Sequence, residues 1–258
     1  MLTSIIIPTC NALSLLRETV ETIRKHTKDP YELIVIDNGS TDGTLEYLRQ
    51  QRIITISLPV NTGFPAACNW GLRLARGDRL LLLNNDVLVT AGWLRRMNRT
   101  LDSDPAVGIV GPMTNYASGK QQIAMDGDYE GFAARLGADQ NKKHESVNRI
   151  IGFCMLFSRS LMKQIGVLDE RFSPGHYEDD DYCYRANQAG FKVVIAKDAF
   201  VYHRGSASFG GYASDELEEL LRRNRRLFKD KWGIDPLEIH EMDDRGELHA
   251  HSDVPEKE

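Results

Sequence analysis

The sequence lacks the motifs that mark several common classes of nucleotide-using enzyme. It has no GxGxxG after its first apolar segment, no GxxxxGK(S/T) and no GxSxG. A dinucleotide dehydrogenase, a P-loop phosphotransferase and a hydrolase with a nucleophile elbow are therefore not expected.

Cysteine pairs and long apolar runs are also missing. The cysteines are far apart and show no CxxC spacing, which favours buried, reduced thiols in a cytoplasmic protein. They are Cys10, Cys68, Cys154 and Cys183. No aliphatic run exceeds the four residues at 80–83, far below the roughly 20 that cross a bilayer. We expect no signal peptide or transmembrane segment, so any membrane association would be peripheral.

The chain also lacks a strong charge of either sign. Its 37 acidic and 32 basic residues give a formal net charge of -5, which provides no reason to expect nucleic acid as a partner. The 258 residues, 41% of them hydrophobic, are enough for one substantial core. We expect one domain over residues 1–234 and a polar, poorly ordered tail or linker over 235–258.

Short apolar runs alternate with segments of helical spacing along the first half of the chain. The runs at 4–8, 33–37, 53–58 and 79–84 are rich in Ile, Leu and Val, as in buried parallel strands. A helix at 91–101 and a strand at 107–110 continue the pattern. This alternation predicts an α/β fold with a doubly wound, mostly parallel sheet and helices on both faces.

The pattern is less regular from residue 112 onward. Residues 112–148 are rich in Gly, Ser, Asn, Gln and Lys, and we expect this stretch to be mobile and to face a substrate. Strands are expected at 151–158, 191–196 and 200–203, with helices near 161–165, 178–189 and 214–232. The expected division is a nucleotide-binding half, about 1–111, and an acceptor-binding half, about 112–234.

Polar residues follow the first four expected strands. In an open parallel sheet, ligands bind at these carboxyl ends. The segments are Pro8-Thr9-Cys10-Asn11, Asp37-Asn38-Gly39-Ser40, residues 59–63 and Asn84-Asn85-Asp86. Small hydrogen-bonding groups with two carboxylates suit a nucleotide. Asp86 ends the apolar segment LLLLNNDV and could ligate a hard divalent cation, although Asn and Asp are also common in turns.

The segment HYEDDDYCYR places consecutive carboxyl groups at an expected helix start. These groups are Glu178, Asp179, Asp180 and Asp181. Capping and the helix dipole can account for acidic residues there. Like charges repel, however, so at least one group should have the raised pKa that a general base requires. A single histidine such as His203 is more often structural than a ligand, so its role depends on its neighbours.

Taken in order, these segments resemble those of glycosyltransferase family 2, whose members are inverting enzymes with the GT-A fold. The resemblance runs from residue 4 to about residue 209. It is carried by SIIIPTCN, IVIDNGSTDGT, NTGFPAACNWGLRLARGD, LLLNNDV, GFCMLFSR, YEDDDYCYRANQAGF and VYHRGSASF. LLLNNDV takes the place of the DxD motif, and Asn84 and Asn85 reduce the negative charge available there for a cation.

The resemblance implies roles for individual residues. Asp179 would be the general base, Asp86 would ligate Mn²⁺ or Mg²⁺, and His203 would be a further ligand of the metal or diphosphate. The donor nucleotide would contact Pro8, Thr9, Asn11, Asp37, Asn38, Gly63, Asn69, Asn84 and Asn85. The acceptor side or its support would include Gly152, Glu178, Asp181 and Arg185.

The reaction implied by the resemblance is a metal-assisted single displacement. A sugar would pass from a nucleoside-diphosphate donor to a glycan, lipid-linked or protein acceptor. UDP-hexose or UDP-N-acetylhexosamine is the first expectation and dTDP-rhamnose the second. A sugar nucleotidyltransferase, which would release pyrophosphate, and a catalytically inactive sugar-binding scaffold remain as alternatives.

Overall fold

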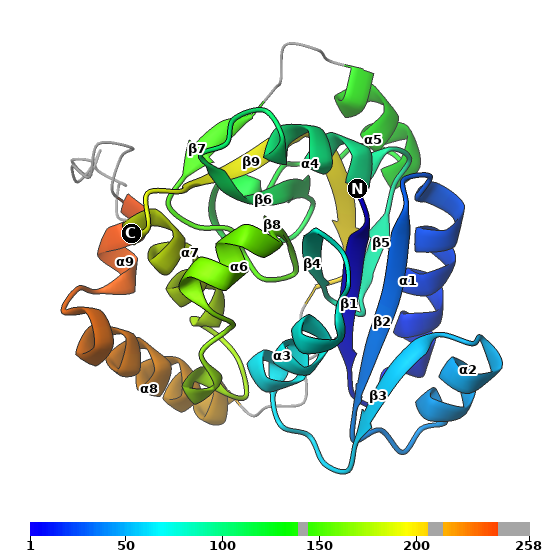
Figure 1. Cartoon of the computed structure of the whole chain (residues 1–258), viewed down its shortest axis with the longest axis horizontal. Coiled ribbons are helices and arrows are strands. Elements are labelled where there is room, and N and C mark those ends of the chain that lie inside the picture. Colours follow the sequence, from blue (N-terminus) through cyan, green and yellow to red (C-terminus); the bar gives the residue numbers. More distant parts are fainter. Residues whose placement is uncertain (139–143, 206–213, 242–258) are drawn as a thin grey trace, which may run out of the picture.

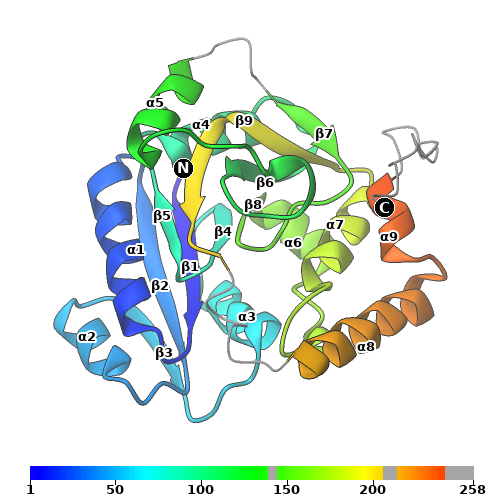
Figure 2. The ribbon, with the colours of Figure 1, turned by 180° about the vertical axis from the view of Figure 1, so that it is seen from behind.

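The computed structural model describes residues 1–138, 144–205 and 214–241. In these residues one nine-stranded sheet has helices on both sides (Figures 1 and 2). The strands are β1 (Thr3–Thr9), β2 (Tyr31–Asn38), β3 (Ile54–Leu58), β4 (Arg79–Leu83), β5 (Val87–Val89), β6 (Val107–Thr114), β7 (Glu145–Val147), β8 (Cys154–Ser158) and β9 (Lys192–His203). The helices are α1 (Leu13–His26), α2 (Thr44–Gln50), α3 (Phe64–Leu74), α4 (Trp93–Leu101), α5 (Tyr129–Ala138), α6 (Arg159–Ile165), α7 (Glu178–Gln188), α8 (Ser214–Trp232) and α9 (Pro236–Glu241), with 3₁₀ turns η1 (Gly119–Gln121) and η2 (Glu170–Phe172).

The first half of the chain forms the parallel part of the sheet, in the order β3-β2-β1-β4. Strands β1, β2 and β4 each contain an unbroken apolar run because both of their faces are covered, whereas the edge strand β3 is partly exposed. Ile5 and Ile7 pack on one side with Leu16 and Val20 of α1, which lie one turn apart. Ile6 packs on the other side, against α3. The expected α/β fold with helices on both faces is confirmed.

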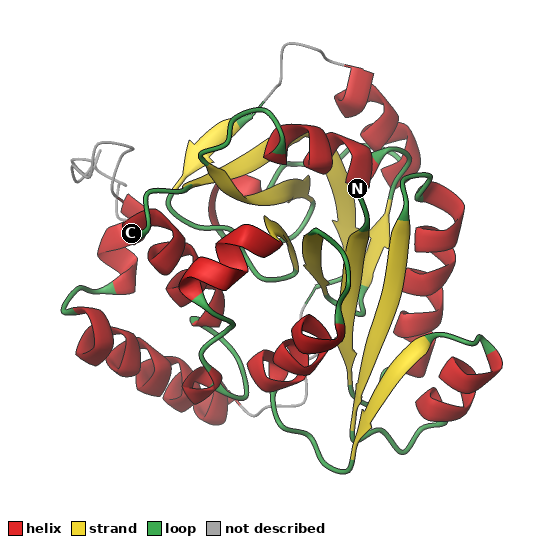
Figure 3. Ribbon diagram, viewed as in Figure 1, coloured by secondary structure: helices red, strands yellow, loops and turns green. Residues whose placement is uncertain are grey.

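The second half of the sheet is mixed. Strand β8 is antiparallel to both β4 and β6, and β5 and β7 are antiparallel to β9, whereas β6 and β9 are parallel. The expectation of a mostly parallel sheet therefore describes the β3-β2-β1-β4 part best. Figure 3 shows the helices on both sides of this mixed sheet.

Several elements differ from the sequence-based expectations, among them the three-residue strands β5 and β7, which were not expected. The stretch expected to be mobile contains α5, whose Ala133 and Leu136 are buried in the core. The two strands expected around 191–203 are one strand, β9. Residues 236–241 of the expected tail form α9, where Ile239 packs against Phe172 and Phe228. Residues 242–258, the rest of that tail, lie outside the described residues.

In the part of the chain that the structure describes, no helix is both long enough and apolar enough to cross a membrane.

Candidate active site

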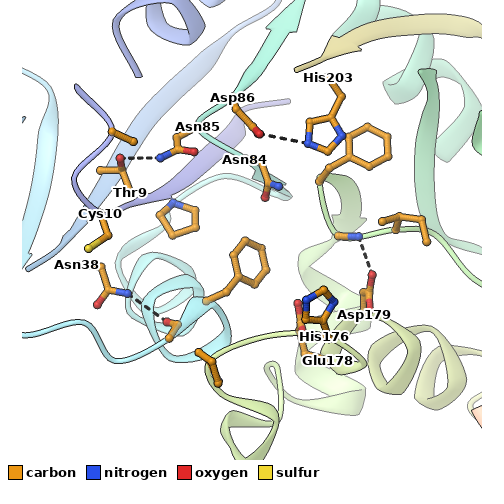
Figure 4. Close-up of a pocket in the computed structure, with 18 of the residues that line it drawn as sticks. Thr9, Cys10, Asn38, Asn84, Asn85, Asp86, His176, Glu178, Asp179 and His203 are labelled. Atoms are coloured by element: carbon orange, nitrogen blue, oxygen red, sulfur yellow. Dashed lines mark hydrogen bonds and ion pairs between the residues drawn. The ribbon is translucent and has the colours of Figure 1, made fainter. Parts of the chain in front are cut away.

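A cavity of about 1080 Å³ lies at the carboxyl ends of the parallel strands (Figure 4). This volume is close to the upper end for small-molecule sites, roughly 300 to 1,000 Å³. Its lining includes most of the residues singled out from the sequence. These are Pro8, Thr9, Asn11, Asn38, Gly63, Asn84, Asn85, Asp86, Gly152, Glu178, Asp179 and His203.

Asp86 and His203 meet at one side of this cavity (Figure 4). Asp86 lies just before β5 and His203 ends β9, and the antiparallel register that pairs Val87 with His203 brings them together. His203 Nε2 lies 3.3 Å from Asp86 Oδ1. Both atoms are buried, and among the described residues neither has a hydrogen-bond partner of good geometry. Two buried polar atoms that face each other in this way fit a bound cation.

The histidine ring is fixed by its surroundings. Its Nδ1 lies 2.9 Å from the carbonyl oxygen of Tyr116, and the ring stacks on Phe153 with 5.0 Å between centroids. Asn115 accepts from the backbone N–H of His203 and donates to its carbonyl oxygen. Because a carbonyl can only accept, Nδ1 carries the proton, and in the neutral ring Nε2 presents a lone pair. This is the arrangement found in metal-ligating histidines.

The described residues include no group of three or more His, Cys, Asp or Glu side chains that could hold a metal ion. The candidate protein ligands at this point are the pair Asp86 and His203. Mg²⁺ commonly binds through one or two protein ligands together with waters and substrate phosphates. The pair fits a cation of that kind better than a structural metal, which needs a closed set of protein ligands.

Asp179 and Glu178 lie on another side of the cavity, at the N-terminus of α7 (Figure 4). Asp179 Oδ2 accepts from the backbone N–H of Gly152 at 2.8 Å, and its Oδ1 accepts from that of Asp180 at 2.9 Å. Burial and the neighbouring carboxylate of Asp180 raise the pKa of Asp179 above the usual value for an aspartate. This shift moves the group toward the neutral range in which a general base works best.

Glu178 is more deeply buried than Asp179. Burial, followed by the charges of Asp179 and Asp180, raises its pKa well above the ordinary glutamate value. Its Oε2 is buried and has no hydrogen-bond partner among the described residues. The two adjacent acids therefore sit in different environments, and Asp179 is the one that backbone donors stabilise in its charged form.

Side chains at the strand ends are joined by hydrogen bonds. Asn85 Nδ2 donates to Thr9 Oγ1 at 2.8 Å, which links the ends of β4 and β1. Asn38 donates to Asn61 Oδ1 at 2.9 Å and accepts from Thr62, which fixes the loop after β3. This network gives the cavity a preformed polar wall.

Four residues singled out from the sequence are not part of the cavity lining. Asp37 is buried and accepts from Ser40 N and Ser57 Oγ, both at 3.1 Å. Asn69 makes a reciprocal pair of bonds with the backbone of Leu168. The other two are Asp181 and Arg185, which bond to each other. All four make contacts that hold elements together, and the carboxylate of Asp37 supports a turn beside the cavity.

Several lining residues were not found from the sequence. Arg149 lies beside Asp180, with 3.5 Å between Nη1 and Oδ1, and donates to Ser118 Oγ at 2.7 Å. Tyr116 and Phe153, which hold the histidine ring, also line the cavity. No local pattern marks these residues, because their roles depend on contacts between distant segments. Cys10 also lines the cavity and is partly exposed, whereas the other three cysteines are buried as expected.

Comparisons with known sequences identify the family of the chain. The family model "Glycosyl transferase family 2" matches residues 4–166. The O-antigen biosynthesis protein RfbC of Myxococcus xanthus is 29% identical over 236 residues, which cover 84% of this chain and 18% of that protein. Glycosyltransferase AglE of Haloferax volcanii is 26% identical over 250 residues, 93% of this chain and 77% of that protein. The chain spans less than a third of the longer relatives, 27% of y4gI of Sinorhizobium fredii and 18% of RfbC.

Solved structures share the fold. The mannosyltransferase PcManGT of Pyrobaculum calidifontis, solved with GDP-Man and Mn²⁺, superposes with a TM-score of 0.61 at 20% identity, covering 86% of this chain and 68% of that chain. TarS 1–349 of S. aureus, solved with UDP-GlcNAc, gives a TM-score of 0.63 at 19% identity, covering 90% of this chain and 66% of that chain. The chain belongs to glycosyltransferase family 2 and has the GT-A fold.

Proposed function

We propose that the chain transfers a sugar from a nucleoside-diphosphate sugar to an acceptor hydroxyl, with inversion at the anomeric carbon. The observation that carries the proposal is one cavity that holds both the Asp86–His203 pair and the Asp179 carboxylate. The pair fits a cation, and the carboxylate has the raised pKa of a general base. The acceptor would be a glycan, a lipid-linked glycan or a protein, and the names "O-antigen biosynthesis protein" and "Low-salt glycan biosynthesis hexosyltransferase" of two relatives favour a glycan.

The donor would bind in the half formed by residues 1–111. Thr9, Asn11, Asn38 and Asn85 offer hydrogen-bonding groups to the nucleoside, and a UDP-linked hexose or N-acetylhexosamine is the favoured donor, with dTDP-rhamnose second. Asp86 and His203 would hold Mn²⁺ or Mg²⁺, which offsets the charge that develops on the leaving diphosphate.

The acceptor would bind in the half formed by residues 112–234, beside α7. Asp179 takes the proton of the acceptor hydroxyl as that oxygen attacks the anomeric carbon from the face opposite the diphosphate. The new glycosidic bond forms as the bond to the nucleoside diphosphate breaks, so the configuration inverts without a covalent enzyme intermediate. The N–H groups of Gly152 and Asp180 keep the carboxylate in place before the proton moves.

A panel of nucleotide sugars tests this function. Each donor is incubated with the protein and either Mn²⁺, Mg²⁺ or EDTA, without acceptor, and release of nucleoside diphosphate is measured. We expect metal-dependent release from one class of donor. Asp86→Asn should abolish release and metal-dependent nucleotide binding. Asp179→Asn should keep binding, and should lower transfer by about 10² to 10⁴ once an acceptor is found.

The exposed Asp126, which does not line the cavity, provides the matched control. Asp126→Asn should behave as the unchanged chain does. Release of pyrophosphate in place of nucleoside diphosphate would indicate a nucleotidyltransferase. Neither release nor metal-dependent nucleotide binding with any donor would indicate a scaffold and would contradict the proposal.

A further inference from the structure

Asn224, a buried polar residue of α8, bonds to the loop that precedes α7. Its side chain is fully buried, and its Nδ2 lies 2.8 Å from the carbonyl oxygens of Phe172 and Gly175 and 3.0 Å from that of His176. Its Oδ1 accepts from Arg223 Nε at 3.0 Å. One amide group therefore holds three carbonyl groups of the same loop, residues 172–177.

This loop has a backbone conformation that needs support. His176 and Tyr177 have φ values of 72° and 70°, and a left-handed conformation is uncommon for residues that carry a Cβ atom. Two such residues in succession persist only where the surrounding contacts hold them. The bonds from Asn224 end at His176, the first of the two.

The loop contacts both halves of the cavity. Pro174, His176 and Tyr177 line it, and Tyr177 is the N-cap of α7, directly before Glu178 and Asp179. On the other side, the carbonyl oxygen of Pro174 accepts from the backbone N–H of Phe64 at 2.8 Å, at the start of α3. A shift of this loop would therefore displace the carboxylate of Asp179 relative to the donor half.

Helix α8 is itself anchored to α7. Lys231 Nζ lies 2.5 Å and Trp232 Nε1 2.8 Å from Oδ1 of the fully buried Asp181. Phe228 packs against Phe172 at the start of the loop. Figure 1 shows α8 alongside the segment that leads into α7. The family model ends at residue 166, so α8 lies beyond the part of the chain that it matches.

We propose that Asn224 is a positioning residue for the transfer reaction: its amide holds loop 172–177 so that Asp179 faces the cavity. This inference rests on the proposed role of Asp179 as general base. Asn224 does not line the cavity among the described residues, so it would act through the loop and not by touching the substrate.

The experiment compares Asn224→Ala with Leu220→Ala. Leu220 is buried one turn earlier on α8, outside the cavity lining, and provides a control for general loss of stability. With the donor identified by the panel, Asn224→Ala should lower kcat per folded molecule by about 10- to 100-fold while the donor KM changes by less than about threefold. Leu220→Ala should lower the melting temperature and leave kcat unchanged.

Hydrogen exchange gives a readout that does not depend on activity. The amide of Asp181 donates to the carbonyl oxygen of Tyr177 at 2.9 Å, so it reports on the joint between loop and helix. Its exchange, and that of residues 175–180, should accelerate in Asn224→Ala and not in Leu220→Ala. Asn224→Asp, which keeps the side-chain volume but loses N–H donors, repeats the test if the alanine variant does not fold.

Equal kcat and equal exchange in Asn224→Ala and the unchanged chain would overturn the inference. A loss of kcat that Leu220→Ala reproduces at the same loss of stability would also overturn it. If the unchanged chain turned over no donor, the proposed function would fail. Unchanged hydrogen exchange at residues 175–180 in Asn224→Ala would separately show that Asn224 does not hold loop 172–177.

Discussion

Glu178 shows how its position in the fold changes the chemistry of a single side chain. Its carboxyl group is buried next to Asp179 and Asp180, and burial is the main cause of its raised pKa. A carboxyl group whose pKa is raised in the folded state is less costly to bury when protonated. The folded protein therefore loses stability as the pH rises from the ordinary glutamate pKa toward the raised one.

Glu178→Gln should consequently stabilise the chain at neutral pH. The neutral amide avoids the cost of a buried charge, so the melting temperature should exceed that of the unchanged chain at pH 7. The difference should shrink as the pH falls to about 3, below the ordinary glutamate pKa of about 4.3, where the glutamate is protonated in both folded and unfolded states. Thermal unfolding of both proteins across this pH range measures the difference in melting temperature. A difference that does not change with pH would contradict the raised pKa of Glu178.

At the scale of elements, a buried carboxylate joins α7 to α8. Asp181 on α7 accepts from Arg185 Nε at 2.9 Å and from Lys231 and Trp232 near the end of α8. Arg185 in turn donates to the backbone carbonyl oxygens of Ile165, the last residue of α6, and of Val167. Asp181 and Arg185 together thus connect α6, α7 and α8 in the acceptor-side half, away from the cavity lining.

Asp181→Asn should destabilise the chain by about 3 to 5 kcal/mol, the usual cost of breaking a buried ion pair. All three side-chain partners of Asp181 are hydrogen-bond donors. The amide nitrogen of an asparagine at this position is also a donor, so it would find no acceptor among them. Chemical denaturation measures the loss. Asp230→Asn, at an exposed position on α8, is the control and should change stability by less than about 0.5 kcal/mol. A loss below about 1 kcal/mol for Asp181→Asn would mean that the bonds of Asp181 to Arg185, Lys231 and Trp232 contribute little to the free energy of unfolding.

At the scale of the whole molecule, the donor and acceptor sides meet at Gly63. Its φ of 87° is in the left-handed region, and a Cβ atom there would lie 2.8 Å from the Cα atom of Pro174. Ser173 and Pro174 belong to the loop that leads to α7, and Gly63 directly precedes α3. The absence of a side chain at this position lets the two sides of the cavity approach each other.

Gly63→Ala should cost more stability than the same change at Gly127. Gly127 also has a positive φ, 68°, but a Cβ atom there would meet nothing within 4 Å. Gly127→Ala should cost about 1 kcal/mol, from backbone conformation alone. Gly63→Ala should cost a further 1 to 3 kcal/mol, roughly the penalty for overpacking, and should lower kcat because loop 172–177 is displaced. Equal losses in the two variants would contradict a close approach at Gly63.

Strong local patterns made much of the fold predictable. Continuous Ile, Leu and Val runs identified β1, β2 and β4, because the central residues of these strands are buried on both faces. The edge strand β3, ITISL, was also expected although it is partly exposed. Strand β5 was missed because it has three residues, and α5 because few of its residues are buried. Helix α9 was missed because its segment is short and polar, and its burial depends on the distant Phe172.

The sequence by itself determined the parallel half of the sheet, and its motifs indicated Asp86, Asp179 and His203 as candidate site residues, all of which line the cavity. Periodicity and strand-end chemistry are local properties that one stretch of chain expresses alone. Only the tertiary structure decided that Asp37 and Asn69 lie outside the cavity lining, that Tyr116 and Phe153 hold the histidine ring, and that Asn224 reaches the loop before α7. These outcomes depend on contacts between segments far apart in the chain, which arise only when the elements pack together.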